Sequence, residues 1–153
     1  MHDVRARFKQ VWYRLDNLVG QYAKNMGINI TTLFVLEILA EEDGVYTQKA
    51  LCEKLMLPKQ LVNSIIKTFW EQGYVELKEA KDRRHKNIRL TDSGKAYAES
   101  ILVPFHLADE RAWDMVTDLE LIAVTAALET YERAMEANLR GALDPSLDDN
   151  RLG

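Results

Sequence analysis

Hydrophobic residues recur at two different spacings along the chain and predict helices toward both ends with strands between them. Apolar positions follow one face of a helix through residues 3–25, and Gly27 supplies a stop signal. Residues 31–40 are apolar on nearly every side, which predicts a short helix buried on several sides. The chain is therefore expected to start with one amphipathic helix and one core helix.

Two further predicted helices are joined by a very short turn. Thr47 is a suitable N-cap for a helix that ends near Met56. Pro58 fits the first turn of the next helix, which runs to Gln72 and stops at Gly73. Two helices joined so closely are typical of a helix-turn-helix.

The segment after Gly73 changes to the alternating pattern of β-strands. Residues 74–78 and 87–90 each place apolar side chains on one face. The stretch between them, residues 79–86, is polar and rich in Lys and Arg. Two short strands around a basic loop predict a β-hairpin, or wing, directly after the helix-turn-helix.

The C-terminal third of the chain is predicted to be helical. Thr91 and the two residues after it open a fifth helix, which Pro104 is expected to kink or break. Thr117 and Glu120 form a capping box for a sixth helix that ends near Arg140. The expected fold class is therefore mainly α with a small β-hairpin wing.

Charge is unevenly distributed, although the formal net charge of the chain is only −4. Residues 49–95 contain 11 Lys and Arg against 6 Asp and Glu, whereas the rest of the chain contains 9 against 18. Binding to nucleic-acid phosphates needs a local basic face, because salt screens charges over about 8–10 Å. The acidic charge of the whole chain therefore does not exclude a nucleic-acid partner.

One face of the predicted fourth helix has side chains that suit the reading of DNA bases. The apolar residues of this helix fall within one half-circle: Leu61, Val62, Ile65, Ile66 and Phe69. The opposite face carries Gln60, Asn63, Ser64 and Lys67, with Lys59 at its edge. Gln and Asn can pair with two atoms of adenine, and Lys can reach guanine or phosphate. A solvated helix face is the alternative, but the position after a tight turn and before a basic hairpin favours contact with bases.

The basic residues of the wing are candidates for contact with DNA phosphates or with a minor groove. They include Arg83, Arg84 and Lys86. Asp82 lies two residues before Arg84, so it can pair with this arginine and hold it in position instead of reading DNA. A solvated turn is the alternative, and the neighbouring helix favours DNA contact.

Three patterns within residues 31–102 are typical of one protein family. They are residues 48–57, Glu71-Gln72-Gly73-Tyr74-Val75, and above all Asp82-Arg83-Arg84 followed by Leu90-Thr91-Asp92-Ser93-Gly94. In these patterns the chain resembles the multiple antibiotic resistance regulator (MarR) family of winged-helix repressors. In this family the last pattern marks the wing and the start of the next helix. The chain departs from the family at Pro58-Lys59-Gln60-Leu61, where members usually carry small Ser or Thr residues. The resemblance therefore does not indicate which DNA sequence is read.

The resemblance implies a winged helix-turn-helix domain that is flanked by N- and C-terminal dimerisation helices. The expected boundaries are residues 31–91 for the winged domain, residues 3–27 and 92–141 for the dimerisation region, and residues 142–153 for a disordered tail. It also implies an obligate homodimer with an effector pocket between the dimer helices and the winged domain. A two-fold dimer would place two recognition helices about 34 Å apart on a pseudo-palindromic site.

The residues themselves support a homodimer. The first and last predicted helices both carry wide apolar stripes, and exposed stripes of that size normally mark interfaces. Packing of the terminal helices back onto their own chain is the alternative.

Aromatic side chains in the dimerisation region are candidates for a pocket that accepts a small aromatic or amphipathic effector. The candidate residues are these aromatic side chains and one histidine: Trp12, Tyr13, Tyr22, Phe105, His106 and Trp113. Aromatic residues at helical spacing also form cores and interfaces, so this alternative stays open. A ligand acts on such a protein only if it prefers one spacing of the recognition helices.

The sequence contains no motif for metal binding, for nucleotide binding or for catalysis by a nucleophile. The three histidines are scattered, no cluster has zinc-ligand spacing, and there is no phosphate-binding glycine loop or nucleophile motif. We therefore expect no metal, no cofactor and no enzymatic activity. The single Cys52 fits a reducing compartment and is expected to be a small buried hydrophobe rather than a redox sensor.

The chain shows no signal for a membrane or for secretion. No apolar run reaches the roughly 18–20 residues of a membrane span, and the first residues lack a signal-peptide pattern. A cytoplasmic protein without a membrane partner is therefore expected.

Together, these observations predict a homodimeric transcriptional regulator, expected to be a repressor, that binds double-stranded DNA through residues 58–90. A winged helix that binds another protein, without a specific DNA site, is the main alternative. Salt separates the two, because a protein that binds phosphates loses affinity steeply as the salt concentration rises.

Overall fold

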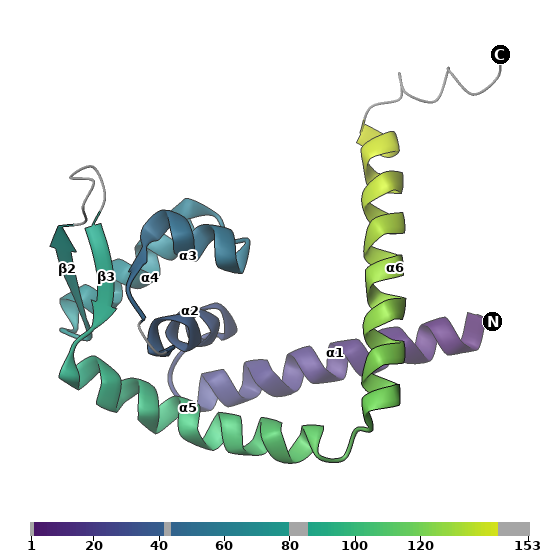
Figure 1. The fold of residues 1–153 in the computed structure, drawn as a ribbon, viewed down its shortest axis with the longest axis horizontal. Coiled ribbons are helices and arrows are strands. Elements are labelled where there is room, and N and C mark those ends of the chain that lie inside the picture. Colours follow the sequence, from purple (N-terminus) through teal and green to yellow (C-terminus); the bar gives the residue numbers. More distant parts are fainter. Residues whose placement is uncertain (1, 42–43, 80–85, 144–153) are drawn as a thin grey trace. The chain divides into compact units, whose positions relative to one another are not determined.

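The computed structural model describes residues 2–41, 44–79 and 86–143, and it divides the chain into two units, residues 1–105 and 106–153 (Figure 1). The elements in chain order are α1 (His2–Asn25), α2 (Ile30–Ala40), β1 (Tyr46–Thr47), α3 (Gln48–Leu55), α4 (Lys59–Glu71), β2 (Val75–Glu79), β3 (Lys86–Leu90), α5 (Asp92–Trp113) and α6 (Asp118–Leu143). The six predicted helices and both strands of the hairpin are present, so the predicted fold class is confirmed. The predicted tail, residues 142–153, lies almost entirely outside the described residues.

The sheet contains one strand that the hydrophobic pattern did not indicate. β1 pairs antiparallel with β3, with Tyr46 opposite Ile88, and gives the strand order β1-β3-β2. A strand of two residues is too short to show a period of two in the sequence. β1 directly precedes α3 and pairs with the wing strand β3. The helix-turn-helix is therefore connected to the hairpin through one sheet.

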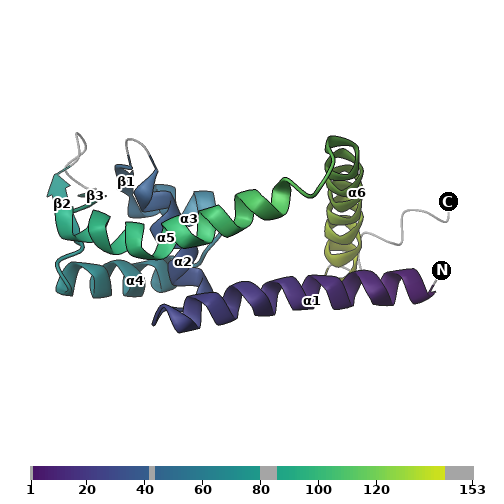
Figure 2. The same cartoon turned by 90° about the horizontal axis from the view of Figure 1, so that it is seen from below.

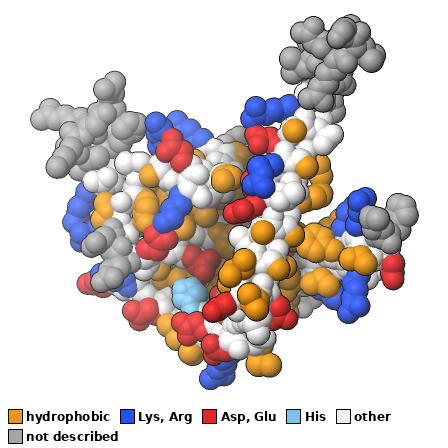
Figure 3. Space-filling model, turned by 45° about the vertical axis from the view of Figure 1, so that its right-hand side comes forward, with side chains coloured by type: hydrophobic (Ala, Val, Ile, Leu, Met, Phe, Trp, Pro, Cys, Tyr) orange, Lys and Arg blue, Asp and Glu red, His pale blue; other side chains and the backbone are white. Residues whose placement is uncertain are grey.

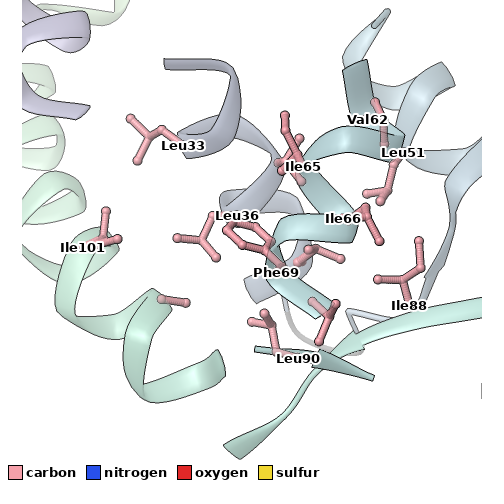
Figure 4. Close-up of a cluster of buried hydrophobic side chains, with 14 of the residues drawn as sticks. Leu33, Leu36, Leu51, Val62, Ile65, Ile66, Phe69, Ile88, Leu90 and Ile101 are labelled. Atoms are coloured by element: carbon pink, nitrogen blue, oxygen red, sulfur yellow. The ribbon is translucent and has the colours of Figure 1, made fainter. Parts of the chain in front are cut away.

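The helices of the winged part meet around a continuous hydrophobic core (Figure 4). Phe69 of α4 is fully buried in it, between Leu36 of α2 and Leu90 of β3. Burial of such a side chain stabilises the fold by about 1.5–3 kcal/mol. The apolar face of α4 is therefore held on the core, and the opposite face is left for solvent or a ligand.

α1 packs on this core only through its C-terminal part. Ala23 is buried, and the Tyr22 hydroxyl donates a hydrogen bond to the Ile101 carbonyl oxygen of α5 at 2.5 Å. The N-terminal half of α1 extends beyond α2 and α4 (Figure 2), and its side chains are exposed. The apolar stripe predicted for this helix is thus only partly used within residues 1–105.

α5 continues through Pro104, so of the two predicted outcomes, a kink or a break, the break is wrong. A proline inside a helix removes one hydrogen bond and costs about 3 kcal/mol. Ile101 and Leu102 are buried just before it, and Phe105 packs on the core just after it. Packing on both sides of Pro104 therefore holds the backbone in the helical path.

A tight junction joins the end of α4 to the start of α5. Gly73 has a φ of 75°, and its carbonyl oxygen accepts hydrogen bonds from the hydroxyls of Thr91 (2.7 Å) and Ser93 (3.0 Å). The Thr91 backbone N–H donates to the Tyr74 carbonyl oxygen at 3.0 Å, and the Gly94 N–H donates to the Thr91 hydroxyl at 3.0 Å. We call these five residues the junction. The hydrogen bonds of the junction explain why the sequence motif has Thr91, Ser93 and Gly94 at these positions.

Gly94 is required in the junction because two backbone segments touch there. A Cβ atom at this position would lie 1.9 Å from the Tyr74 carbonyl oxygen. The contact is reinforced by the Tyr74 and Tyr97 rings, which stack with centroids 4.1 Å apart. The backbone at Tyr74, directly before β2, therefore approaches α5 so closely that no side chain fits at position 94.

We predict that Gly94→Ala lowers the free energy of unfolding by about 3 kcal/mol, because the added methyl group must displace backbone rather than a side chain. Urea unfolding at a fixed protein concentration measures the change. Gly20→Ala is the matched control. An added Cβ at Gly20 meets nothing within 4 Å, so the stability should stay unchanged or rise by up to about 1 kcal/mol. Equal midpoints for Gly94→Ala and the parent protein would contradict the close approach.

Candidate nucleic-acid interface

The turn between α3 and α4 has the geometry of a helix-turn-helix. The Thr47 hydroxyl accepts a hydrogen bond from the Ala50 N–H at 3.1 Å, which confirms the predicted cap of α3. α3 ends at Met56, which has a φ of 52° and is 89% exposed. The left-handed conformation costs a residue with a side chain roughly 1–2 kcal/mol. Pro58 then serves as the N-cap residue of α4.

α3 is fixed relative to its neighbours by side-chain contacts at both ends. The Gln48 side-chain amide donates to the Lys59 carbonyl oxygen at 3.2 Å, which links the first turns of α3 and α4. Lys54 at the other end donates to both carboxylate oxygens of Glu41, at 2.7 and 2.6 Å, and Tyr46 also donates to Glu41. Hydrogen bonds from Lys54, then from Tyr46, lower the pKa of Glu41 below its ordinary value. These contacts link α3 to the first turn of α4 at one end and to the residue after α2 at the other.

The structure brings the predicted base-reading residues together on one exposed face of α4. Val62, Ile65, Ile66 and Phe69 are buried on the other side of the helix. The exposed residues are Lys59, Gln60, Asn63, Ser64 and Lys67. Lys67 forms a 3.8 Å ion pair with Glu71, and both side chains are exposed. Such a surface pair contributes little, so Lys67 can exchange Glu71 for another anion.

Two residues of α4 differ from the sequence-based expectation. Leu61 was expected to face inward but is 39% exposed, because it lies at the edge of the apolar half-circle. Trp70 is 56% exposed and lies two helical turns after Asn63, near the edge of the polar face. The spacing of seven residues is the sequence signal that would have placed Trp70 there.

The strands of the wing carry a charge cluster that the sequence analysis did not single out. Glu76 is opposite Arg89 in the β2–β3 register, and Lys78 lies on the same face of the sheet. Glu76 accepts hydrogen bonds from Arg89 and pairs with Lys78 at 3.1 Å. Hydrogen bonds from Lys78 and then from Arg89 lower the pKa of Glu76. The wing thus presents Lys78 and Arg89 around one carboxylate, which the pairing of the two strands would have predicted.

The predicted wing residues are only partly described. Lys86 is exposed at the start of β3. Asp82, Arg83 and Arg84 lie outside the described residues, so their expected roles stay predictions.

The aromatic candidates for an effector pocket fall in different environments. Tyr22 and Phe105 contact each other, with ring centroids 5.4 Å apart, and burial raises the pKa of Tyr22. Trp12 and Tyr13 are exposed on the part of α1 that extends beyond α2. His106 and Trp113 belong to the second unit of the chain. In this unit the Trp113 indole N–H donates to Asp109 at 3.1 Å.

Other candidate chemistry is not assembled in the part of the chain that the structure describes. Cys52 is half-buried and packs against the hydrophobic core. Within residues 2–41, 44–79 and 86–143, no three His, Cys, Asp or Glu side chains are placed to hold a metal ion. None of the described helices is both long and apolar enough to cross a membrane.

A helix-turn-helix followed by a β-hairpin and framed by further helices defines a winged helix-turn-helix domain. Residues 26–85 match the model of the MarR family. The winged part of this chain is therefore similar to the MarR family. No curated protein sequence matches the chain.

Solved structures of MarR family proteins have a similar fold over most of the chain. The regulator NMB1585 from Neisseria meningitidis is 29% identical, covers 92% of this chain and 96% of its own, and has a TM-score of 0.70. AbsC, a transcriptional regulator from Streptomyces coelicolor, is 18% identical over 89% of this chain and 94% of its own, with a TM-score of 0.74. MepR from Staphylococcus aureus, solved in a complex with DNA, is 20% identical over 85% of this chain and 96% of its own, with a TM-score of 0.67.

Proposed function

We propose that this protein is a DNA-binding transcriptional regulator that acts as a homodimer on a pseudo-palindromic duplex site. The observation that carries the proposal is the exposed polar face of α4, which a rigid helix-turn-helix presents next to a basic hairpin. The MarR family match and the solved DNA complex of MepR support it. The protein acts by binding, and no catalytic step is part of the proposal.

The residues on α4 supply the base contacts in this proposal. The side-chain amides of Gln60 and Asn63 each offer a donor and an acceptor, which matches the N6 and N7 edge of adenine in the major groove. Lys59 and Lys67 bind guanine or phosphate, and Ser64 bonds to either. Each well-placed bidentate pair gives about 1–3 kcal/mol of discrimination between bases.

The wing supplies contacts to the DNA backbone. The exposed Lys86, together with Lys78 and Arg89 around Glu76, places positive charge on the strands. Arg83 and Arg84 in the loop are proposed to reach phosphates or a minor groove, with Asp82 holding Arg84 in position. Such contacts position a protein on duplex DNA without reading its sequence.

The surfaces of α1 and α6 support a homodimer. Exposed hydrophobic side chains follow both helices (Figure 3). On α6 they include Leu119, Leu121, Ile122, Val124, Tyr131, Met135 and Leu139. Monomeric proteins rarely leave apolar patches of this extent in water. The charges are complementary as well: α1 has five Lys and Arg against two Asp and Glu, and α6 has two against five.

Regulation by a ligand is the remaining part of the proposal. We propose that the protein represses transcription and is released by a small aromatic or amphipathic ligand bound in the dimerisation region, where Tyr22 and Phe105 contact each other. In one conformation of the dimer the two α4 helices have the spacing that fits DNA. The ligand must bind this conformation less tightly than another one, because equal affinity for both shifts no equilibrium.

Selection of bound duplexes from a random pool tests the DNA-binding proposal. The parent protein should enrich a pseudo-palindrome, and Asn63→Ala should enrich sites in which one position of each half-site has lost its preference. Ser100→Ala, at an exposed position of α5 away from α4, is the control and should enrich the parent site. If Asn63→Ala selects the parent site unchanged, Asn63 does not read a base. If no duplex is enriched by the parent, the winged helix is a protein-binding module instead.

Sedimentation tests the dimer. The parent chain of 17.6 kDa should sediment at twice its mass. Val124→Glu places a charge on the apolar stripe of α6 and should shift the protein toward monomer, because a buried unpaired charge is costly. Ala126→Glu, on the opposite face of α6, is the control and should stay dimeric. A monomeric parent protein would show that the terminal helices pack on their own chain.

A further inference from the structure

The exposed face of α4 is polar along its centre but not along one edge. At 100° per residue, Leu61 and Thr68 lie within about 20° of each other around the helix axis. Gln60 and Lys67 lie near the centre of the exposed face, and Asn63 lies toward its other edge. The exposed surface of α4 therefore has a hydrogen-bonding stripe with a second, different stripe beside it.

Leu61 makes the N-terminal end of this second stripe apolar. Its side chain is 39% exposed, whereas its neighbour Val62 is fully buried. The Leu61 N–H donates to the Pro58 carbonyl oxygen at 3.0 Å, which places Leu61 in the first turn of α4. In a helix-turn-helix the N-terminal residues of the recognition helix contact the base edges. Leu61 is therefore an exposed aliphatic group at the position where bases are read.

Thr68, which lies in the same stripe, has no free hydrogen-bond donor in its side chain. Its hydroxyl donates to the Ser64 carbonyl oxygen at 3.0 Å, within the helix. A hydroxyl group has one donor, and here that donor is used. The stripe formed by Leu61 and Thr68 thus has no O–H or N–H available for a base edge, in contrast to Gln60 and Asn63 elsewhere on the exposed surface of α4.

We propose that Leu61 selects thymine through contact with its C5-methyl group in the major groove. The thymine methyl group is the apolar feature that base pairs present in this groove, and aliphatic side chains contact it. Gln60 and Asn63 read neighbouring positions by hydrogen bonds, so one helix face reads both polar and apolar features of the site. The inference rests on the proposed DNA-binding function and adds the base that the first turn of α4 recognises.

Replacement of thymine by uracil tests this contact, because it removes the methyl group and leaves the pairing edge unchanged. The probe is the duplex that the parent protein enriches, with each dT of a half-site replaced by dU in turn. The parent protein should bind about fourfold less tightly for one such replacement, the value of one buried methyl group. Leu61→Ala should bind the dT and dU forms of that position equally. Gln60→Ala, the control on the adjacent position, should keep the fourfold difference.

Further variants keep the test decisive if Leu61→Ala does not fold. Leu61→Asn keeps the size and branching of the side chain but makes it polar, and it should also lose the difference between dT and dU. Leu61→Met stays apolar and should retain it. Parent protein that binds every dU duplex as tightly as the dT duplex would overturn the inference but not DNA binding. The same holds if the Leu61 variants keep the full difference. Failure of the parent to enrich any duplex would overturn the proposed function itself.

Discussion

The backbone contact between Gly94 and Tyr74 is the constraint on which the arrangement of the winged domain depends. It joins the C-terminal end of α4, the first residue before β2 and the first turn of α5. Hydrogen bonds from Thr91 and Ser93 to Gly73 close the same junction. The angle at which the hairpin leaves α4 is therefore set by hydrogen bonds and a steric limit rather than by a flexible loop. The two strands of the wing are thereby joined directly to the C-terminal end of α4.

The two faces of α4 explain how one short helix serves both the core and the proposed interface. Val62, Ile65, Ile66 and Phe69 bury one side and hold the helix against α2 and the sheet. Because these contacts and the link from Gln48 to Lys59 hold the helix, the polar side chains opposite them need little reorganisation to meet a ligand. The apolar stripe of α6 and the N-terminal part of the stripe of α1 are exposed within their own units, which is why the proposal assigns them to a second copy of the chain.

Most of the fold could be predicted from the sequence because its helices carry clear local signals. The caps at Thr47 and Thr117 and the glycine stops at Gly27 and Gly73 are all present in the structure. The features that could not be predicted depend on contacts between distant residues. β1 exists only through its pairing with β3, the cluster around Glu76 needs the strand register, and Pro104 is tolerated because packing outweighs its local cost. Leu61 was misplaced because the periodicity gives an angle on the helix and not the depth of the neighbouring core.

The most direct test of the account is the affinity of the full chain for its selected duplex as a function of salt concentration. The account predicts a steep loss between about 50 and 200 mM salt, at least a thousandfold for six or more phosphate contacts. Lys67→Gln should flatten the slope of log affinity against log salt by about 1.8 if each protomer of a dimer loses one phosphate contact. An affinity that does not change with salt would contradict binding through the basic face of α4 and the wing.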